Sequence, residues 1–267
     1  MREPPVLATE DLTIRFGGHV AVDAVTCAFE RGTLTAIVGP NGAGKTTYFN
    51  LVSGQLKASA GTVRLNGEDI TRLGVADRCE RGIGRAFQLT NLFPSLSVRE
   101  NVRLVAQSRA RRGFDLFSRA SSHVELIERA EHVLAEVRLA DKRDVTVSAL
   151  PHGDQRKLEV ALMIALGAQV LMFDEPTAGM SVDEVPVILD LIRELKADKD
   201  RTILLVEHKM DVIRTLADRI VVLHNGALVA DGEPGEVMRS AIVQEAYLGK
   251  APDTATPQTA ATETAHG

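Results

Sequence analysis

One glycine-rich stretch near the N-terminus constrains this 267-residue chain more than any other feature. The stretch matches the pattern G-x-x-x-x-G-K-[ST] at every fixed position. It lies between an apolar run at 33–38 and a helix-like segment at 46–52 without proline, and strand, loop and helix in this order are the context that a phosphate-binding loop requires. With these flanks, a glycine-rich turn that matches by chance is the weaker interpretation. The predicted phosphate-binding residues are Gly39, Pro40, Asn41, Gly42, Ala43, Gly44, Lys45, Thr46 and Thr47.

The residue types in this loop suit a polyphosphate. Gly39, Gly42 and Gly44 can take backbone angles that other residues avoid, so consecutive N–H groups can point into one concavity at the start of a helix. Lys45 adds a mobile positive charge for the β- and γ-phosphates, and Thr46 offers a hydroxyl oxygen of the kind that Mg²⁺ prefers. The loop therefore predicts a nucleoside triphosphate site with Mg²⁺.

Composition and charge narrow the class of protein. The contents of 45% hydrophobic and 25% charged residues are those of an ordinary globular protein, and a formal net charge of −5 argues against a general nucleic-acid binder. Cys27 and Cys79 have no metal-like spacing, which favours a reducing compartment. The N-terminus lacks the apolar core of a secretory signal, and the longest apolar run, 160–173, is shorter than the roughly 20 residues that span a bilayer. We therefore expect a cytoplasmic location, with any membrane contact made through a partner.

Hydrophobic patterns divide the chain into a strand-rich start, a helical middle and a βαβ alternation. The predicted strands, two of them joined in a hairpin by Gly17-Gly18, are 7–16, 20–29, 61–66, 83–88, 170–174, 202–206, 219–223 and 227–230. The predicted helices are 70–81, 97–110 with a capping box of Ser97 and Glu100, 124–137, 182–196 and two short ones up to Leu248. Residues 111–122 are expected to form a loop, and the Ala-, Thr- and Pro-rich end from Lys250 a disordered tail.

Two of these strands are continuous apolar runs that end in polar groups. Val170–Phe173 is followed by Asp174 and Glu175, and the second run, from Thr202, is followed by Glu207 and His208. Such runs fit strands buried on both faces of a parallel sheet, and ligands gather at the carboxyl ends of such strands.

These polar groups suit hydrolysis. We expect Asp174 to be an outer holder of Mg²⁺, Glu175 to act as general base on water, and His208 to contact the γ-phosphate or to orient that water. Each group alone has a structural alternative, because carboxylates cap strands and a single histidine is usually structural. The order and spacing of all three favour hydrolysis over binding alone.

With these residues in place, the chain resembles the ATP-binding subunits of ATP-binding cassette (ABC) transporters from about Leu7 to Leu248. The resemblance implies an α/β fold: a P-loop NTPase (RecA-like) core, an N-terminal antiparallel β subdomain and an inserted α-helical subdomain. It implies one ATPase domain over 1–250, with 1–90 and 168–250 as β subdomain and nucleotide-binding core, 91–167 as helical subdomain, and a disordered tail at 251–267.

The same resemblance implies ATP and Mg²⁺ as cofactors and assigns a role to each matching residue. Gly39–Thr47 is then the Walker A loop, Val170–Asp174 is Walker B, Glu175 is the catalytic glutamate and His208 is the switch histidine. Gln88 becomes the Q-loop glutamine that meets Mg²⁺ and the membrane subunit. Phe16, which as a hairpin phenylalanine is a core residue by default, takes the place of the adenine-stacking aromatic.

The family's signature, Leu-Ser-Gly-Gly-Gln, departs from its pattern here. The matching stretch is Leu150-Pro151-His152-Gly153-Asp154, in which Pro151 lacks the hydroxyl and the N–H of a serine and Asp154 adds a negative charge. Gly153 and the helix N-terminus remain, so some anion affinity is expected. Ser181 also replaces the usual Asp or Asn of the D-loop. These departures predict a weakened signature half and therefore a heterodimer with a second ATP-binding subunit.

Within the family, the stretches 87–102, 155–161, 175–180, 206–211 and 244–249 resemble importers of branched-chain amino acids and related polar substrates. Importers of urea and short amides and the lipopolysaccharide-export ATPase share parts of them. The implied partners are two transmembrane permease subunits and, indirectly, an extracytoplasmic solute-binding protein, with no nucleic acid. The implied location is the cytoplasmic face of the inner (plasma) membrane. Two other classes stay open, a soluble cassette ATPase acting on nucleic acid or ribosomes and a small-molecule kinase.

Overall fold

The computed structural model describes residues 4–86, 92–110, 120–240 and 243. Three predictions lie wholly or partly outside these residues: the role of Gln88, residues 111–119 of the loop expected over 111–122, and the disordered tail at 251–267. Most of the second short helix expected before Leu248 lies outside them as well.

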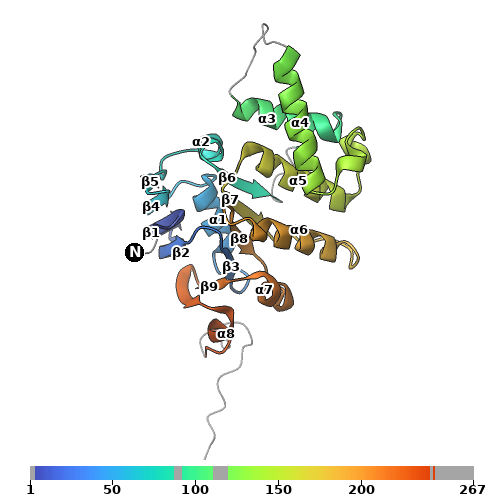
Figure 1. Ribbon diagram of the computed structural model, residues 1–267. Coiled ribbons are helices and arrows are strands. Elements are labelled where there is room, and N and C mark those ends of the chain that lie inside the picture. Colours follow the sequence, from blue (N-terminus) through green and yellow to red (C-terminus); the bar gives the residue numbers. More distant parts are fainter. Residues whose placement is uncertain (1–3, 87–91, 111–119, 241–242, 244–267) are drawn as a thin grey trace, which may run out of the picture.

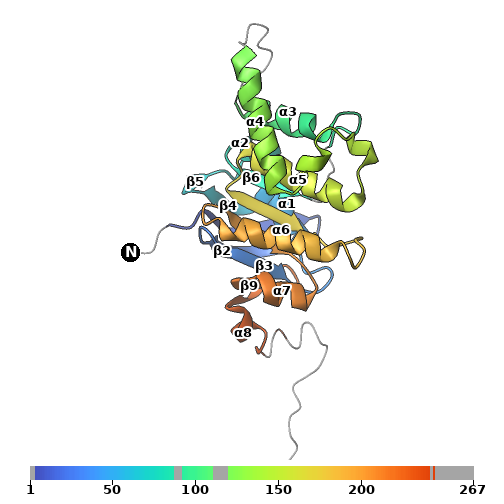
Figure 2. The ribbon, with the colours of Figure 1, turned by 45° about the vertical axis from the view of Figure 1, so that its right-hand side comes forward.

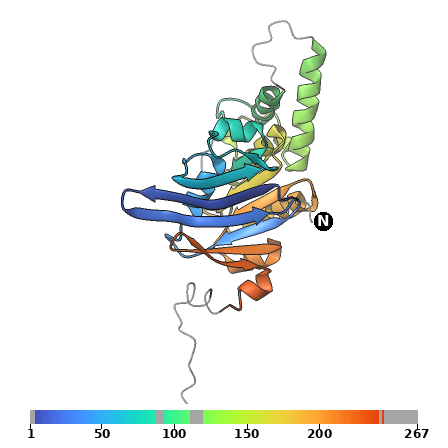
Figure 3. The same ribbon diagram turned by 90° about the vertical axis from the view of Figure 1, so that its left-hand side faces the viewer.

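An antiparallel sheet is built mainly from the N-terminal segment. Its strand order is β2-β1-β4-β5, with bounds β1 Leu7–Phe16, β2 His19–Phe29, β4 Ala60–Leu65 and β5 Glu68–Asp69. Figure 3 shows the long β1–β2 hairpin facing the viewer. Gly17 turns this hairpin with a φ of 59°, a value that glycine adopts without steric cost. The predicted hairpin and antiparallel sheet are confirmed.

A second sheet carries the parallel strands. Its order is β10-β9-β3-β8-β7-β6, with bounds β3 Leu34–Val38, β6 Ile83–Ala86, β7 Val170–Asp174, β8 Thr202–Val206, β9 Arg219–His224 and β10 Ala227–Gly232. All neighbours in this sheet are parallel except β10, which returns antiparallel to β9 through the predicted hairpin.

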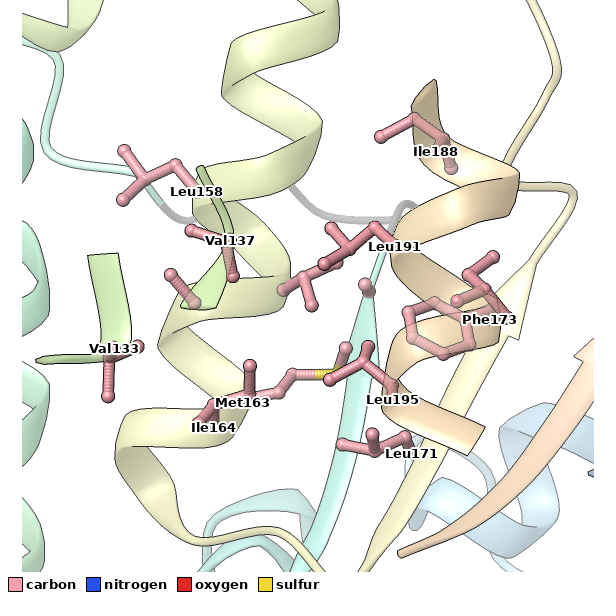
Figure 4. Packing of buried hydrophobic residues seen from close by; sticks show 14 of the residues in the cluster. Val133, Val137, Leu158, Met163, Ile164, Leu171, Phe173, Ile188, Leu191 and Leu195 are labelled. Carbon is pink, nitrogen blue, oxygen red and sulfur yellow. The ribbon is translucent and has the colours of Figure 1, made fainter. Parts of the chain in front are cut away.

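The apolar runs are continuous because both faces of the parallel sheet are covered. On β7, Val170 and Met172 belong to a core with α1 (Lys45–Ser53) and the antiparallel sheet. Leu171 and Phe173 point to the opposite core, where they lie beside Leu191 and Leu195 of α6 in Figure 4. The alternation of side chains along the strand thus assigns each residue to one of two cores.

The helices gather at one end and over the faces of the parallel sheet. Figure 1 shows α3, α4 and α5 together beyond the edge strand β6, and Figure 2 shows α6 across one face of the sheet. The bounds are α2 Val75–Glu80, α3 Val98–Arg109, α4 Ala120–Glu136, α5 His152–Leu166, α6 Val185–Ala197, α7 Met210–Leu216 and α8 Pro234–Val237. The subdomain limits at 90/91 and 167/168 stay a prediction. None of the helices in the described ranges has the length and apolarity needed to cross a membrane.

Three local predictions differ from the structure. The loop expected over 111–122 ends before Ala120, where α4 begins, so residues 120–122 are helical. The helix expected over 70–81 begins only at Val75, because Thr71 is held in a turn by Asp69, whose Oδ1 accepts its N–H at 2.9 Å and its hydroxyl at 2.6 Å. The capping box at α3 is half formed. Ser97 Oγ accepts the Glu100 N–H at 3.2 Å, but the Glu100 carboxylate pairs with Arg103 instead of returning to Ser97.

Candidate functional site

The glycine-rich loop connects β3 to α1 in a conformation that only glycine fits at two points. Gly39 has a φ of 153°, and a Cβ there would lie 2.1 Å from the Leu223 carbonyl oxygen on β9. Gly44 has a φ of 96°, and its Cβ would lie 2.5 Å from the Ala21 carbonyl oxygen on β2. Both distances are far inside van der Waals contact. Backbone from both sheets therefore fixes the loop in place, and a side chain at either position would displace it.

Lys45 lies at the first position of α1 with its ammonium turned into the loop. Its Nζ donates to the carbonyl oxygens of Gly39 at 2.7 Å and Pro40 at 2.9 Å. Burial lowers the pKa of Lys45, although the carboxylates of Glu175 and Asp174 act in the opposite direction. A positive charge and a helix N-terminus thus converge on one concavity, which is the arrangement that anions prefer.

A pocket of about 340 Å³ opens at this concavity. It is lined by loop residues 41–47 together with His19, Ala21 and Glu175. The volume lies within the range of small-molecule sites, about 300–1,000 Å³. Of the three polar groups predicted at the strand ends, Glu175 is the one that the structure brings into the lining. A cradle of backbone N–H groups, one ammonium and a facing carboxylate suits a polyphosphate next to a reactive water.

Glu175 reaches the pocket through an unusual backbone conformation. Its φ is 50°, in the left-handed region that non-glycine residues rarely adopt, and its N–H donates to the Val206 carbonyl at 2.9 Å. Such a conformation costs of order 1–3 kcal/mol and persists only where the surroundings enforce it. The turn directs the carboxylate from the end of β7 toward the loop.

Asp174, the predicted metal ligand, is paired with an arginine. Its Oδ2 lies 2.8 Å from Arg85 Nη2, and both side chains are buried. Burial raises the pKa of the Asp174 carboxyl, although Arg85 opposes that shift. Thr46, the second predicted ligand, is exposed at the start of α1. The hydroxyl and the carboxylate are hard oxygen donors, so their chemistry fits Mg²⁺.

His208 follows β8 but does not line the pocket among the residues that the structure describes. Its side chain is 55% exposed, and its Nδ1 lies 3.6 Å from Glu207 Oε2. Glu207 itself is completely buried and accepts the Thr177 hydroxyl at 2.5 Å and the His208 N–H at 3.1 Å. The buried carboxylate therefore links the segment after Glu175 to the segment that carries His208.

A model of the ABC transporter family matches residues 22–178. This chain belongs to the ABC transporter family. The high-affinity branched-chain amino acid transport ATP-binding protein BraF of Pseudomonas aeruginosa is 38% identical over 253 residues, which cover 92% of this chain and 99% of BraF. The corresponding protein LivG of Escherichia coli is 35% identical over 254 residues, with coverage of 92% and 99%.

The fold agrees with this membership. The ADP conformation of MJ1267, described as an ATP-binding cassette of an ABC transporter, superposes with a TM-score of 0.77 at 28% identity, covering 92% of this chain and 99% of the other. The predicted P-loop α/β fold is confirmed, as is the prediction of an ABC ATPase. The cassette binds nucleotide, and its hydrolysis of ATP energises transport.

Phe16 stands beside the nucleotide pocket of the cassette rather than in its lining. The ring is 50% exposed at the end of β1, and Phe16 pairs across the hairpin with His19, which does line the pocket. Stacking of Phe16 on adenine stays a prediction. Because its ring is exposed at the end of the hairpin, Phe16 is not the core residue that a hairpin phenylalanine is by default.

The signature region of the cassette contains an internal carboxylate that sequence reasoning missed. The Gly153 N–H, expected to be open to an anion, donates to Glu184 Oε1 at 3.2 Å. The other oxygen of Glu184 accepts the N–H and hydroxyl of Ser181, at 3.1 and 3.0 Å. These hydrogen bonds, led by those from Ser181, lower the pKa of Glu184. The ionised Glu184 side chain of the same subunit thus accepts the hydrogen bond from the Gly153 N–H, the group that was predicted to bind phosphate.

The negative charge expected at Asp154 is also compensated within the subunit. Asp154 Oδ1 lies 2.8 Å from Lys157 Nζ, and Oδ2 pairs with Lys142. Burial alone would raise the pKa of Asp154, but the hydrogen bonds from the two lysines lower it. The sequence places Lys157 one helical turn after Asp154, so this pairing could be anticipated. The contact from Lys142 could not.

Proposed function

We propose that this ABC ATPase energises the import of branched-chain amino acids. The observation that carries the proposal is the 38% identity to BraF, which extends over 99% of that protein. Import of urea, amides or another polar solute, or export of a lipopolysaccharide-type substrate, is the alternative, since such systems share parts of the same motifs. The permease and binding-protein partners select the solute. The residues of this chain therefore indicate the type of transport system, and the solute is assigned by similarity to that type.

In this proposal each group around the pocket has one task. The loop N–H groups and Lys45 bind the phosphates of ATP, Phe16 stacks on the adenine, and Glu175 accepts a proton from the attacking water. His208 contacts the terminal phosphate or orients the water, which requires its exposed ring to turn toward the pocket.

Thr46 and Asp174 hold Mg²⁺, together with Gln88, which lies outside the described residues. The metal ion, when bound, supplies charge neutralisation at the phosphate oxygens.

We further propose that the permease docks at a groove beside the edge strand β6. This groove has a volume of about 250 Å³ and a mainly apolar lining that includes Leu92, Val105 and Leu162. Phe93, next in the chain, has a ring that is 50% exposed, although its backbone is fixed by hydrogen bonds to the buried Asn101 side chain at 2.8 and 3.1 Å. An exposed aromatic ring on a hydrogen-bonded backbone next to an apolar groove is suited to anchor a partner protein. Two permease subunits would hold the ATPase at the cytoplasmic face of the membrane.

Reconstituted transport tests both proposals. With its permease subunits and binding protein in proteoliposomes, the wild-type ATPase should hydrolyse ATP faster with leucine-loaded binding protein and accumulate leucine. Phe93→Ser should leave hydrolysis by the isolated chain unchanged and lower leucine uptake roughly thirtyfold, since losing an aromatic anchor costs about 2 kcal/mol of binding.

Val124→Ser is the matched control, because Val124 on α4 is 53% exposed and is not among the described residues that line the groove. Uptake of urea but not leucine would contradict the proposed solute. Normal uptake with Phe93→Ser would contradict the docking surface.

The departures in the signature support pairing with a second, different ATP-binding subunit. Pro151 precedes α5 and donates no hydrogen bond, while the Glu184 carboxylate already occupies the Gly153 N–H. We expect the homodimer to hydrolyse ATP slowly and Pro151→Ser to raise that rate severalfold, since serine restores a hydroxyl and an N–H at the preferred helix N-cap position. Phosphate release by the purified protein measures this. Pro234→Ser, at the first turn of α8, is the control, and a fast homodimer that Pro151→Ser leaves unchanged would contradict heterodimer pairing.

A further inference from the structure

Arg85 on β6 is a buried arginine to which the sequence assigned no role. Its side chain is 7% exposed, and that of Asp174 on the neighbouring strand is 4% exposed. The two strands pair in parallel, with Arg85 opposite Met172, so the guanidinium lies along the sheet edge where Asp174 ends β7. Removing two charges from water is costly, and leaving one of them without its partner costs more. The pair is therefore a strong local constraint on the Asp174 carboxylate.

The same guanidinium also binds the far end of α1. The two hydrogens of Arg85 Nη1 are shared among Asn50 Oδ1 at 2.6 Å, Ser53 Oγ at 3.1 Å and, just after the helix, Gln55 Oε1 at 3.0 Å. Its carbon Cζ lies 5.5 Å from the centroid of the Phe49 ring. Since α1 begins in the phosphate loop, Arg85 joins the metal-binding carboxylate to the helix that carries this loop. Arg85 and Ser53 also line the groove proposed above for the permease.

We propose that Arg85 is a positioning residue that serves as the internal counter-ion of Asp174 in the metal-free site and yields the carboxylate to Mg²⁺. This inference rests on the proposed function, in which Asp174 holds the metal ion. The Asp174 oxygen that accepts the Arg85 N–H at 2.8 Å is a hard donor of the kind that Mg²⁺ prefers, and a buried carboxylate stays ionised only when a cation or hydrogen-bond donors compensate its charge. Arginine and metal ion therefore compete for one group, and metal occupancy changes how firmly Arg85 is held at α1.

Magnesium titration of ADP binding tests this competition without turnover. Calorimetry on the full chain at increasing free Mg²⁺ gives the concentration at which the affinity for ADP is half-maximally enhanced. Arg85→Met removes the competitor, so this concentration should fall about tenfold, the size of effect expected for losing one competing hydrogen bond to a charged group. Arg85→Lys keeps a charge but not the planar fork, so it should lower the concentration by a smaller factor.

The sign of the change separates competition from other roles. An arginine that merely orients Asp174 for the metal would give a higher Mg²⁺ requirement on removal, and a purely structural arginine would give no change. Either result overturns the inference. Arg81→Met, at an exposed arginine four residues earlier that pairs with Glu68, is the matched control and should leave the requirement unchanged.

The lysine variant decides the test if Arg85→Met does not fold. A Mg²⁺ requirement in Arg85→Lys equal to that of the wild type then overturns the inference, and a lower one supports it. If ADP binding by the wild type does not depend on Mg²⁺ at all, the proposed metal site fails and the inference fails with it. Equal dependence in wild type and variants overturns the inference alone.

Discussion

Lys45→Ala should lower the affinity of the cassette for ATP at least a hundredfold and abolish hydrolysis. The ammonium lies inside the loop, held by the carbonyl oxygens of Gly39 and Pro40. Hydrogen bonds to charged groups contribute about 1.5–3 kcal/mol each, and Lys45 is expected to make them to two phosphates, so the loss amounts to about 3–6 kcal/mol. Titration with a fluorescent ATP analogue measures the affinity, and phosphate release measures turnover.

Two controls separate this electrostatic loss from damage to the loop. Lys57→Ala removes an exposed lysine shortly after α1 and should change neither affinity nor turnover. Lys45→Met keeps the aliphatic stem in the buried position without the charge, so it should bind ATP as poorly as Lys45→Ala while unfolding at nearly the temperature of the wild type. If either Lys45 variant binds ATP with normal affinity, the loop is not the phosphate site.

The parts of the fold that sequence predicts well are those specified by local patterns. The strands β7 and β8 are apolar at successive positions because their side chains pack alternately into two cores, as Leu171 and Met172 do. This pattern is visible in the sequence alone. The start of α2 could not be predicted in the same way. Residues 70–74 were expected to continue the helix, but the Asp69 carboxylate binds Thr71 and keeps the chain in a turn, and Gly74 is a poor helix former.

The residues of the site also fall into two groups, those that local sequence motifs identify and those that only the tertiary fold brings together. The glycine-rich loop and the carboxylates at the end of β7 are contiguous motifs that the sequence identifies locally, and of the two carboxylates the structure brings Glu175 into the pocket lining. Arg85 and Asp174 are 89 residues apart, Gly153 and Glu184 are 31 apart, and Thr177 and Glu207 are 30 apart. These contacts depend on strand order and helix packing, which a single sequence does not specify. A charged residue ending or interrupting an apolar strand, as Glu207 and Arg85 do, is the signal that points to them.

Glu175→Gln should reduce ATP hydrolysis by about 10²–10⁴-fold, the usual contribution of a general base, while the affinity for ATP stays within about twofold of the wild type. Glutamine has nearly the shape of glutamate and keeps the backbone N–H that donates to Val206, so the turn at φ 50° is retained. What it loses is the ability to accept a proton at neutral pH. ATP should therefore remain bound and hold two cassettes in a closed dimer, which size-exclusion chromatography with ATP detects.

A control substitution at a distant carboxylate tests whether the loss of hydrolysis is specific to Glu175. Glu128→Gln on the exposed side of α4 removes the same charge far from the pocket lining and should leave hydrolysis unchanged. Glu175 is the carboxylate that lines the loop pocket among the described residues, whereas His208 lies outside that lining with a mostly exposed ring. Normal turnover with Glu175→Gln would therefore show that the general base is not at the end of β7. A His208→Ala variant with near-wild-type turnover, beside an inactive Glu175→Gln, would leave Glu175 as the base and contradict the proposed role of His208 in orienting the water or the terminal phosphate.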